Sequence, residues 1–434
     1  MDMIRSFGKY FMLAGLFLAG CKKDDVPSHA PGAPMTISEF MPAQGGGGTS
    51  VLINGSNFTS DTSELEVTIN GNKLAIIGAN TNQIMAVVPK KCGTGNIVVK
   101  VGGDEIASTA VFNYMFTRNV TTFAGNGTAG FANGKGEEAQ FNFNKEAWYR
   151  SKGIVTDDEG NVFVADPGNH CIRKITPEGD VTVFSGNPNA AGHADGQGLT
   201  AQFSLPYDLT IDNDQNLYCV DPGNWDIRKI SPDGTALTIG WATGEPWSVA
   251  YDKSSNTLYY LSAANGNVYK VAPDGSSEAV ITGINSPAGM GFDAQGNLYV
   301  ASNGDHTILK FEKGSSTGIA IAGAAGASGY VNGTGADARF AFPWGLCIDA
   351  AGNIYVAGNG TWDGGTYNPD QSIRFIDAKN GEVSTYAGSG TAGYANAIGE
   401  AAAFSAPGGV AVDRNGIVYV LDKNNNRVRR IISE

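Results

Sequence analysis

Residues able to support acid–base or metal chemistry are few and scattered in this 434-residue sequence. The four histidines, His29, His170, His193 and His306, show no HExxH spacing and no cluster with cysteine. Six aspartates recur before turns that contain Gly or Asn: Asp157, Asp212, Asp252, Asp293, Asp349 and Asp413. Aspartate in this setting binds turn backbone, which favours turn capping over acid–base or calcium roles. The sequence therefore predicts no catalytic residue, no metal site and no cofactor.

Large aromatic side chains recur at a fixed distance before these aspartates. Five residues before each aspartate stand Lys152, Tyr207, Trp247, Ala288, Trp344 and Gly408. Proline precedes five of the six and fixes the local backbone, so we expect the side chains to point in a defined direction. Nearby turns add His170, Trp225, His306 and Trp362, and Trp148 lies just before the first copy.

We expect these residues to form an aromatic-walled funnel at the mouth of a channel. Aromatic faces stack on the apolar faces of sugars, and each ring contributes roughly 0.5 to 1.5 kcal/mol beyond its buried area. Three rings would approach the roughly 4 kcal/mol of a millimolar site, which multivalent display at a surface reinforces. The funnel therefore predicts weak glycan binding. The alternative is that the aromatic residues only plug the channel and pack against neighbouring loops.

These residues belong to a sequence unit that occurs six times. Each copy has a short apolar strand, an aspartate, a turn and a strand rich in Tyr and Val. The copies span 153–166, 208–221, 248–261, 289–302, 345–358 and 409–422. Third strands follow, as at 171–175, 226–230, 307–311 and 372–376, and outer strands follow these at 181–186 and 383–388. Four strands per repeat predict a β-propeller over 118–434.

The last copy indicates how the ring closes. It stops after its third strand, at 427–433, and lacks an outer strand, whereas 120–125 (VTTFAG) resembles the missing piece. Pairing the two would remove an exposed sheet edge. The sequence therefore predicts six blades, closed by an N-terminal outer strand.

The turn after the second strand carries a recognisable motif. The run Asp166-Pro-Gly-Asn-His170-Cys-Ile-Arg173 resembles the NHL repeat, with further copies at 221–228 and 422–429. Copies three and five depart from this pattern. The resemblance implies a propeller, and because NHL propellers often recognise proteins, it keeps a protein-binding or structural module open as the alternative function. Propeller lyases and lactonases are similar in fold, but we find no converging ligands for their metals.

Four of the connections between blades are long, related and rich in glycine: 123–141, 184–203, 321–340 and 386–404. No Lys-Ser or Lys-Thr pair and no strand–helix context follows them, which argues against a phosphate-binding loop. We expect these insertions to build one face of the propeller, on which the ligand binds.

Residues 34–116 have a different pattern. Strands at 49–58, 65–71, 83–89 and 95–103 alternate between apolar and polar residues and are separated by Gly and Asn turns, which predicts a β-sandwich. The run Ile53-Asn-Gly-Ser-Asn-Phe58, Pro89 and Phe112-Asn-Tyr114 resemble the immunoglobulin-like IPT/TIG domain. That resemblance implies a spacer or binding adaptor.

The amino terminus resembles an export signal. Residues 1–20 have basic residues before an apolar stretch too short to span a bilayer, as in a signal peptide. Leu18-Ala-Gly-Cys21 resembles a bacterial lipobox, which implies lipidation of Cys21, and Lys22-Lys-Asp-Asp25 is similar to the export signal of Bacteroidetes surface lipoproteins. Residues 21–33 are the expected tether. We expect an outer-membrane lipoprotein facing the cell exterior; an ordinary signal peptide is the alternative.

Composition narrows the partners. Acidic residues exceed basic ones by 13 (42 − 29), so nucleic acid and anionic lipid surfaces are disfavoured as partners. The expected partner, a glycan or a cell-surface protein, rests on the funnel and on the resemblance to NHL repeats. Four cysteines follow Cys21 at wide spacing: Cys92, Cys171, Cys219 and Cys347. We expect buried thiols; a Cys171–Cys219 disulfide is the alternative.

Overall fold

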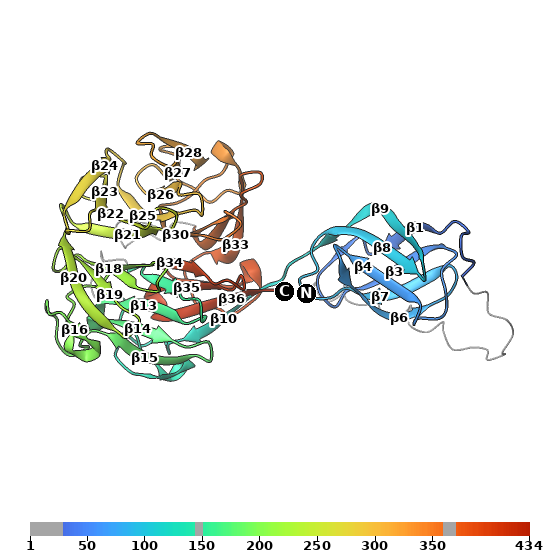
Figure 1. The fold of residues 1–434 in the computed structure, drawn as a ribbon, viewed down its shortest axis with the longest axis horizontal. Coiled ribbons are helices and arrows are strands. Elements are labelled where there is room, and N and C mark those ends of the chain that lie inside the picture. Colours follow the sequence, from blue (N-terminus) through green and yellow to red (C-terminus); the bar gives the residue numbers. More distant parts are fainter. Residues whose placement is uncertain (1–28, 144–150, 359–369) are drawn as a thin grey trace, which may run out of the picture. The chain divides into compact units, whose positions relative to one another are not determined.

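A computed structural model of the chain describes residues 29–143, 151–358 and 370–434. The chain forms two compact units, one of Met1–Phe116 with Glu434 and one of Thr117–Ser433 (Figure 1). Both are built from β-strands, and the described ranges contain short 3₁₀ helices but no α-helix. No helix in these ranges has the length and apolar character that crossing a membrane requires. The all-β prediction is confirmed.

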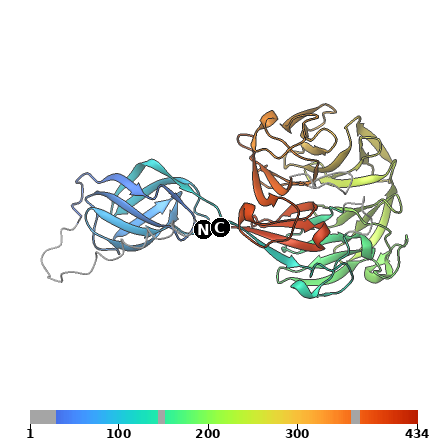
Figure 2. The same ribbon diagram turned by 180° about the vertical axis from the view of Figure 1, so that it is seen from behind.

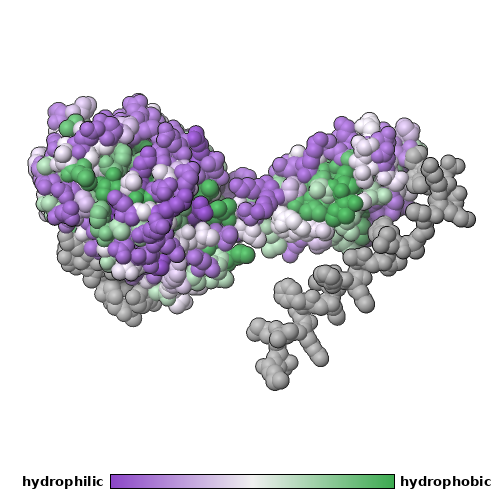
Figure 3. Space-filling model, turned by 90° about the horizontal axis from the view of Figure 1, so that it is seen from below, coloured by the Kyte–Doolittle hydropathy of each residue, from purple (hydrophilic) through white to green (hydrophobic). Residues whose placement is uncertain are grey.

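The smaller unit is a sandwich of two sheets. One sheet has the order β1-β3-β7-β6 and the other β2-β9-β8-β4-β5. The strands are β1 (Thr36–Met41), β2 (Gln44–Gly45), β3 (Ser50–Ser56), β4 (Leu65–Ile69), β5 (Asn72–Lys73), β6 (Ala75–Ala79), β7 (Gln83–Val87), β8 (Gly95–Val101) and β9 (Asp104–Tyr114). Every second residue of β4 is buried, so the alternation seen in the sequence separates the core from the surface. Figure 3 shows hydrophobic residues gathered on part of this unit's surface.

In the ranges that the structure describes, the larger unit contains six sheets of four main strands, one per repeat. Blades 1 and 2 are β12 (Ile154–Thr156), β13 (Val162–Asp166), β14 (Cys171–Ile175) and β15 (Asp180–Ser185), then β17 (Asp208–Ile211), β18 (Leu217–Asp221), β19 (Asp226–Ile230) and β20 (Thr235–Trp241). Blades 3 and 4 are β21 (Pro246–Asp252), β22 (Thr257–Ser262), β23 (Asn267–Val271) and β24 (Ser277–Ile281), then β25 (Pro287–Phe292), β26 (Leu298–Ser302), β27 (Thr307–Phe311) and β28 (Gly318–Gly323).

Blades 5 and 6 complete the unit. They are β30 (Pro343–Ile348), β31 (Ile354–Gly358), β32 (Gln371–Ile376) and β33 (Glu382–Gly390), then β34 (Pro407–Val412), β35 (Val418–Asp422), β36 (Arg427–Ser433) and β10 (Arg118–Ala124). Three two-residue strands in the connections, β11 (Gly134–Lys135), β16 (Gly196–Gln197) and β29 (Gly333–Thr334), extend the sheets of blades 1, 2 and 5.

Blade 6 joins the two ends of the propeller segment. Strand β10 pairs antiparallel with β36, with Val120 opposite Ile431 and Thr121 opposite Arg430. Both strands lie side by side in the front and rear views (Figure 1, Figure 2). This is the pairing predicted from 120–125, and it covers an edge of β36 that would otherwise expose unpaired backbone groups.

Buried arginines hold the four long insertions. In blade 1, Arg173 donates from Nη1 to the Gln140 carbonyl (3.0 Å) and from Nη2 to the Ala132 carbonyl (2.8 Å). The same pattern occurs in blades 2, 5 and 6, at Arg228, Arg374 and Arg429. Blades 3 and 4, whose preceding connections are short, have Tyr269 and Leu309 at this position. The insertions are therefore packed parts of the blades.

The recurrent aspartates act as turn caps. Asp293 Oδ1 accepts hydrogen bonds from the backbone N–H groups of Gln295 (3.0 Å) and Asn297 (2.9 Å), and Oδ2 accepts one from Asn297 Nδ2 (2.8 Å). Asp349 makes the equivalent bonds in blade 5. The turn-capping prediction is confirmed at both residues.

Candidate functional site

The inner strands bring the six equivalent positions together at one end of the central channel. The Trp247 ring centroid lies 6.0 Å from that of Tyr207 and 5.9 Å from that of Trp344. Lys152 Nζ lies 5.5 Å from the Tyr207 ring centroid. The predicted convergence of these side chains is therefore present.

The rings do not line an open funnel, however. Tyr207, Trp247 and Trp344 are 1%, 7% and 0% exposed, and Ala288 is buried beside them. The cause is the close approach of the inner strands, because a Cβ on Gly289 would lie 2.4 Å from the Trp344 carbonyl oxygen. The aromatic side chains consequently fill the axis, which is the plug that the sequence left open as the alternative. We call Lys152, Tyr207, Trp247 and Trp344 the axial plug.

Lys152 brings a buried charge into the axial plug. Its Nζ donates to the Ala288 carbonyl and lies 3.8 Å from Asp208 Oδ2, which also accepts a hydrogen bond from Ser248 Oγ (2.6 Å). Burial lowers the pKa of Lys152 to about 8, although Asp208 opposes this. Burial also raises the pKa of Asp208, against the effect of Lys152. Each residue is thus the main counter-charge of the other, and neither is free to act as a surface ligand.

The predicted turn residues mostly support neighbouring connections. His170 Nδ1 donates to the Ser204 carbonyl (2.5 Å), and His306 Nδ1 accepts from the Phe342 backbone N–H (3.3 Å). Both histidines have left-handed backbone, with φ of 53° and 59°. Trp225 shares that conformation, but its side chain is exposed at the surface. Trp148, Trp362 and Cys21, three further predicted site residues, lie outside the described residues.

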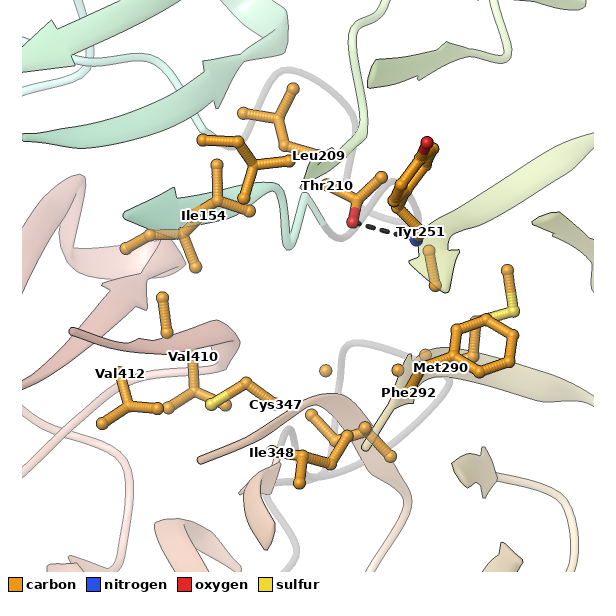
Figure 4. Close-up of a pocket in the computed structure, with 18 of the residues that line it drawn as sticks. Ile154, Leu209, Thr210, Tyr251, Met290, Phe292, Cys347, Ile348, Val410 and Val412 are labelled. Atoms are coloured by element: carbon orange, nitrogen blue, oxygen red, sulfur yellow. Dashed lines mark hydrogen bonds between the residues drawn. The ribbon is translucent and has the colours of Figure 1, made fainter. Parts of the chain in front are cut away.

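A cavity of about 550 Å³ occupies the rest of the channel, lined by inner strands of all six blades. Figure 4 shows ten labelled side chains around the empty centre: Ile154, Leu209, Thr210, Tyr251, Met290, Phe292, Cys347, Ile348, Val410 and Val412. About half of its lining residues are aliphatic, Lys152 of the axial plug and Asp208 line its inner end, and Lys253, Asp293 and Asp349 also line it. This size and lining are typical of small-molecule sites.

The cavity opens on the face opposite the insertions. Residues three positions before the aspartates, such as Leu209 and Met290, are buried. Residues one position before them, such as Ile211 and Phe292, are partly exposed in every blade. Exposure therefore increases toward the aspartate turns, whereas the axial plug closes the insertion-rich end.

Sequence reasoning missed this cavity because its lining resembles ordinary strand core. One signal was available: in five of six copies a large apolar residue stands directly before the turn aspartate, where a strand is about to reach solvent. These residues are Ile211, Tyr251, Phe292, Ile348 and Val412.

The cysteines of the described residues form no disulfide bond. Cys92, Cys171, Cys219 and Cys347 are all free, so the alternative Cys171–Cys219 disulfide was wrong. Burial raises the pKa of the Cys347 thiol, which lines the cavity, far above its usual value. Across the described ranges, no group of three or more His, Cys, Asp or Glu side chains is placed to hold a metal ion.

Comparisons of sequence identify the building blocks. A family model for the IPT/TIG domain matches residues 35–116, and one for the NHL repeat matches residues 404–431. The chain is 26% identical over 342 residues to NHL repeat-containing protein 2 of Bos taurus, covering 64% of this chain and 45% of that protein. It is 24% identical over 327 residues to Protein SUPPRESSOR OF QUENCHING 1, chloroplastic, of Arabidopsis thaliana, covering 72% and 27%. The chain thus spans less than half the length of these relatives.

Solved structures share the fold across both units. A Bacteroides thetaiotaomicron protein of unknown function has a TM-score of 0.63 at 20% identity, covering 94% of this chain and 100% of that chain. Two proteins titled auxiliary nutrient binding proteins, from B. thetaiotaomicron and Bacteroides ovatus, have TM-scores of 0.58 and 0.59 at 21% and 20% identity. They cover 94% of this chain, and 99% and 100% of theirs. The chain therefore combines an IPT/TIG domain with a propeller that carries an NHL repeat.

Proposed function

We propose that this protein is a binding protein that holds a small ligand in the central cavity of its propeller. The cavity carries this proposal, because all six blades contribute to it and the axial plug closes one end. Structural neighbours titled auxiliary nutrient binding proteins support a binding role.

The lining indicates the ligand class. Aliphatic side chains such as Leu209, Met290 and Val410 surround the middle of the cavity, and Asp208 lies beside the axial plug. A ligand with an apolar body would bury that body against these walls, at about 25 cal/mol per Å² of apolar surface. The inner end of the ligand would lie beside Lys152 and Asp208, which already pair with each other, so a neutral hydroxyl suits this end better than a charged amine. We therefore propose a compact amphipathic nutrient.

We further propose that the protein is anchored by lipid to Cys21 and displayed on the outer membrane, facing the exterior. The lipobox-like sequence and the following Lys22-Lys-Asp-Asp25 support this location. Metabolic labelling with an alkyne fatty acid tests it: Cys21→Ser should remove the label, and external protease should digest the wild-type protein on intact cells.

A screen of small nutrients by thermal shift tests the cavity, because a ligand that binds only the folded state raises Tm. Val412→Trp places a large ring among the partly exposed lining residues and should abolish the shift for any hit. Ile319→Trp adds the same ring on the exposed outer strand β28 and should leave the shift intact. Equal shifts in both variants would refute the channel site.

A second candidate is glycan binding on the insertion-rich face. Trp225 supports it, because its ring is half exposed on that face. Selective signals on a glycan array that disappear in Trp225→Ala would establish this function. Trp247→Ala and Trp344→Ala are unsuitable for that test, since both rings are part of the axial plug. A blank array together with capture of a cell-surface protein would favour the protein-binding alternative.

A further inference from the structure

The four insertions allow a comparison within one molecule, and blade 2 differs from the other three. An aromatic residue packs on the buried arginine in blades 1, 5 and 6, namely Phe131, Tyr330 and Tyr394 at 4.8–4.9 Å. Asparagine follows two residues later: Asn133, Asn332 and Asn396. Blade 2 has His193 and Asp195 at these two positions. Two residues before its arginine, blade 2 has Asp226, where the others have Cys171, Ser372 and Arg427.

These substitutions concentrate carboxylates around one guanidinium. Arg228 Nη2 lies 3.0 Å from Asp195 Oδ1, and Arg228 Nε lies 4.0 Å from Asp226 Oδ2. Asp221, close by, accepts hydrogen bonds from two backbone N–H groups. Three carboxylates, those of Asp195, Asp221 and Asp226, therefore lie around one arginine. In the other insertion-bearing blades the asparagine carries no such charge.

Asp226 is the least satisfied of these carboxylates. It is fully buried, and neither oxygen accepts a hydrogen bond from the described part of the chain. His193 Nε2 lies 2.8 Å from Oδ2, but not in hydrogen-bond geometry. Burial and the negative charge of Asp221 raise the pKa of Asp226 to about 7. The acid thus lacks the donors that normally accompany a buried carboxylate.

Two exposed tryptophans adjoin this pair, Trp241 through a ring contact with His193 and Trp225 through its place in the chain. Trp241 is 59% exposed, lies opposite Asp226 in the β19–β20 pairing, and has its ring centroid 5.0 Å from that of His193. Trp225 is 50% exposed and precedes Asp226, and its carbonyl accepts a hydrogen bond from the Ala242 N–H (2.9 Å). We define the blade-2 corner as His193, Asp195, Trp225, Asp226 and Trp241.

We propose that the blade-2 corner binds a ligand through an organic ammonium group. Indole faces attract cations, and nearby carboxylates add a direct electrostatic attraction. The carboxylates gathered around Arg228 favour such a group, whereas a neutral sugar would stack on the rings without needing Asp195 or Asp226. The proposal is independent of the channel cavity, and it narrows the glycan candidate to ligands that carry a positive charge.

Choline and its neutral isostere 3,3-dimethyl-1-butanol are the probes for the full chain, titrated by NMR. Choline should bind at least about tenfold more tightly than the neutral compound. Trp241→Ala should weaken choline binding about tenfold. Equal binding of both probes, or a preference for the neutral one, would overturn the proposal.

The other blades supply the matched control. The triple variant H193Y/D195N/D226S gives blade 2 the residues that blade 5 has, so it should fold and hold Arg228 as blade 5 holds Arg374. It should lose choline binding while keeping its thermal shift with any channel ligand. If this folded variant binds choline as strongly as the wild-type protein does, the blade-2 corner is not the choline site. If it binds choline weakly but also no longer binds the channel ligand, that ligand does not bind in the cavity, and only the cavity proposal fails.

Discussion

The two ends of the propeller channel are built from the same six strands but in opposite ways. At the insertion-rich end the equivalent positions hold Lys152, Tyr207, Trp247, Ala288, Trp344 and Gly408, a set of very unequal sizes that together fill the axis. At the other end each strand contributes apolar side chains, mostly large, and the centre stays open (Figure 4). In this propeller, side chains of very different sizes at equivalent positions therefore indicate a packed axis, and side chains of similar apolar character indicate the cavity.

The reason is geometric. Six side chains of equal size on a closed ring either collide at the axis or leave a hole. Filling the axis requires large and small residues together, as in a packed core. Gly409 lets two inner strands approach closely at this end, since a Cβ there would lie 2.0 Å from the Lys152 carbonyl oxygen. Unusual residues at symmetry-related positions are thus weak evidence for a ligand site.

Trp344→Ala tests this contrast with the largest expected effect. Trp344 is fully buried, so its removal should cost about 3–5 kcal/mol of unfolding free energy, measured by urea denaturation. Ile348→Ala, four residues along β30 at the open end, should cost about 1 kcal/mol, because Ile348 is partly exposed. Similar costs for both variants would contradict the assignment of a packed end and an open end.

Lys152→Met removes the ammonium from the axial plug and leaves Asp208 buried without its cation. The expected cost is about 3 kcal/mol at pH 7, and the double variant with Asp208→Asn should recover much of it. Failure of the double variant to recover stability would show that the methionine, and not the lost charge pair, is at fault.

The same variant has a pH signature. The Lys152 pKa of about 8 lies below its value of 10.5 in the unfolded chain. Between these pH values the unfolded state holds the extra proton, so wild-type stability should gain from this group as pH rises from 8 to 10.5. Lys152→Met should lack that gain when the two unfolding curves are compared. Parallel curves across this range would mean that Lys152 is not buried as described.

Arg374→Lys tests how firmly the insertion-rich face is packed. Arg374 donates to the Val331 and Arg339 carbonyls and to Asn332 Oδ1, which a lysine cannot reach together. We expect a loss of about 2 kcal/mol and faster hydrogen exchange in 324–339. Arg339→Ala, which removes bonds only to Ala336 and Ala338 in the same insertion, should leave exchange in the rest of the blade unchanged.

The sequence predicted the strands and their pairing, which follow from periodic patterns, but not the packing of the axial plug, which depends on how closely the folded strands approach. Alternation and repeat spacing located the strands, and the orphan strand at 120–125 was paired correctly, because such pairing follows from backbone groups that need partners. Whether Trp247 and Trp344 surround a funnel or fill it depends on how closely the strands approach, through Gly289 and Gly345. That spacing is a property of the assembled ring and has no local signature.

The blade-2 corner was missed for a related reason. His193 and Asp195 are unremarkable as single residues of a loop. They become informative only when the four insertions are aligned on the arginines that hold them, and the role of those arginines was known only from the folded blades. Comparing copies within the chain, after the fold is known, recovers this information.

Asp349→Ala, at the rim of the open end, should have the smallest effect. Asp349 Oδ1 accepts from the Ala351 and Asn353 N–H groups, both 2.9 Å, on an exposed turn where water replaces lost partners. We expect a loss of about 1 kcal/mol, and Asp349→Asn should lose less because it keeps an acceptor. Because this turn borders the cavity, any channel ligand should bind more weakly to Asp349→Ala. Lys152→Met should also change the affinity for that ligand, because Lys152 lines the inner end of the same cavity. A loss above that of Trp344→Ala would reverse the contrast between the two ends, because the open rim would then carry more of the stability than the packed axis.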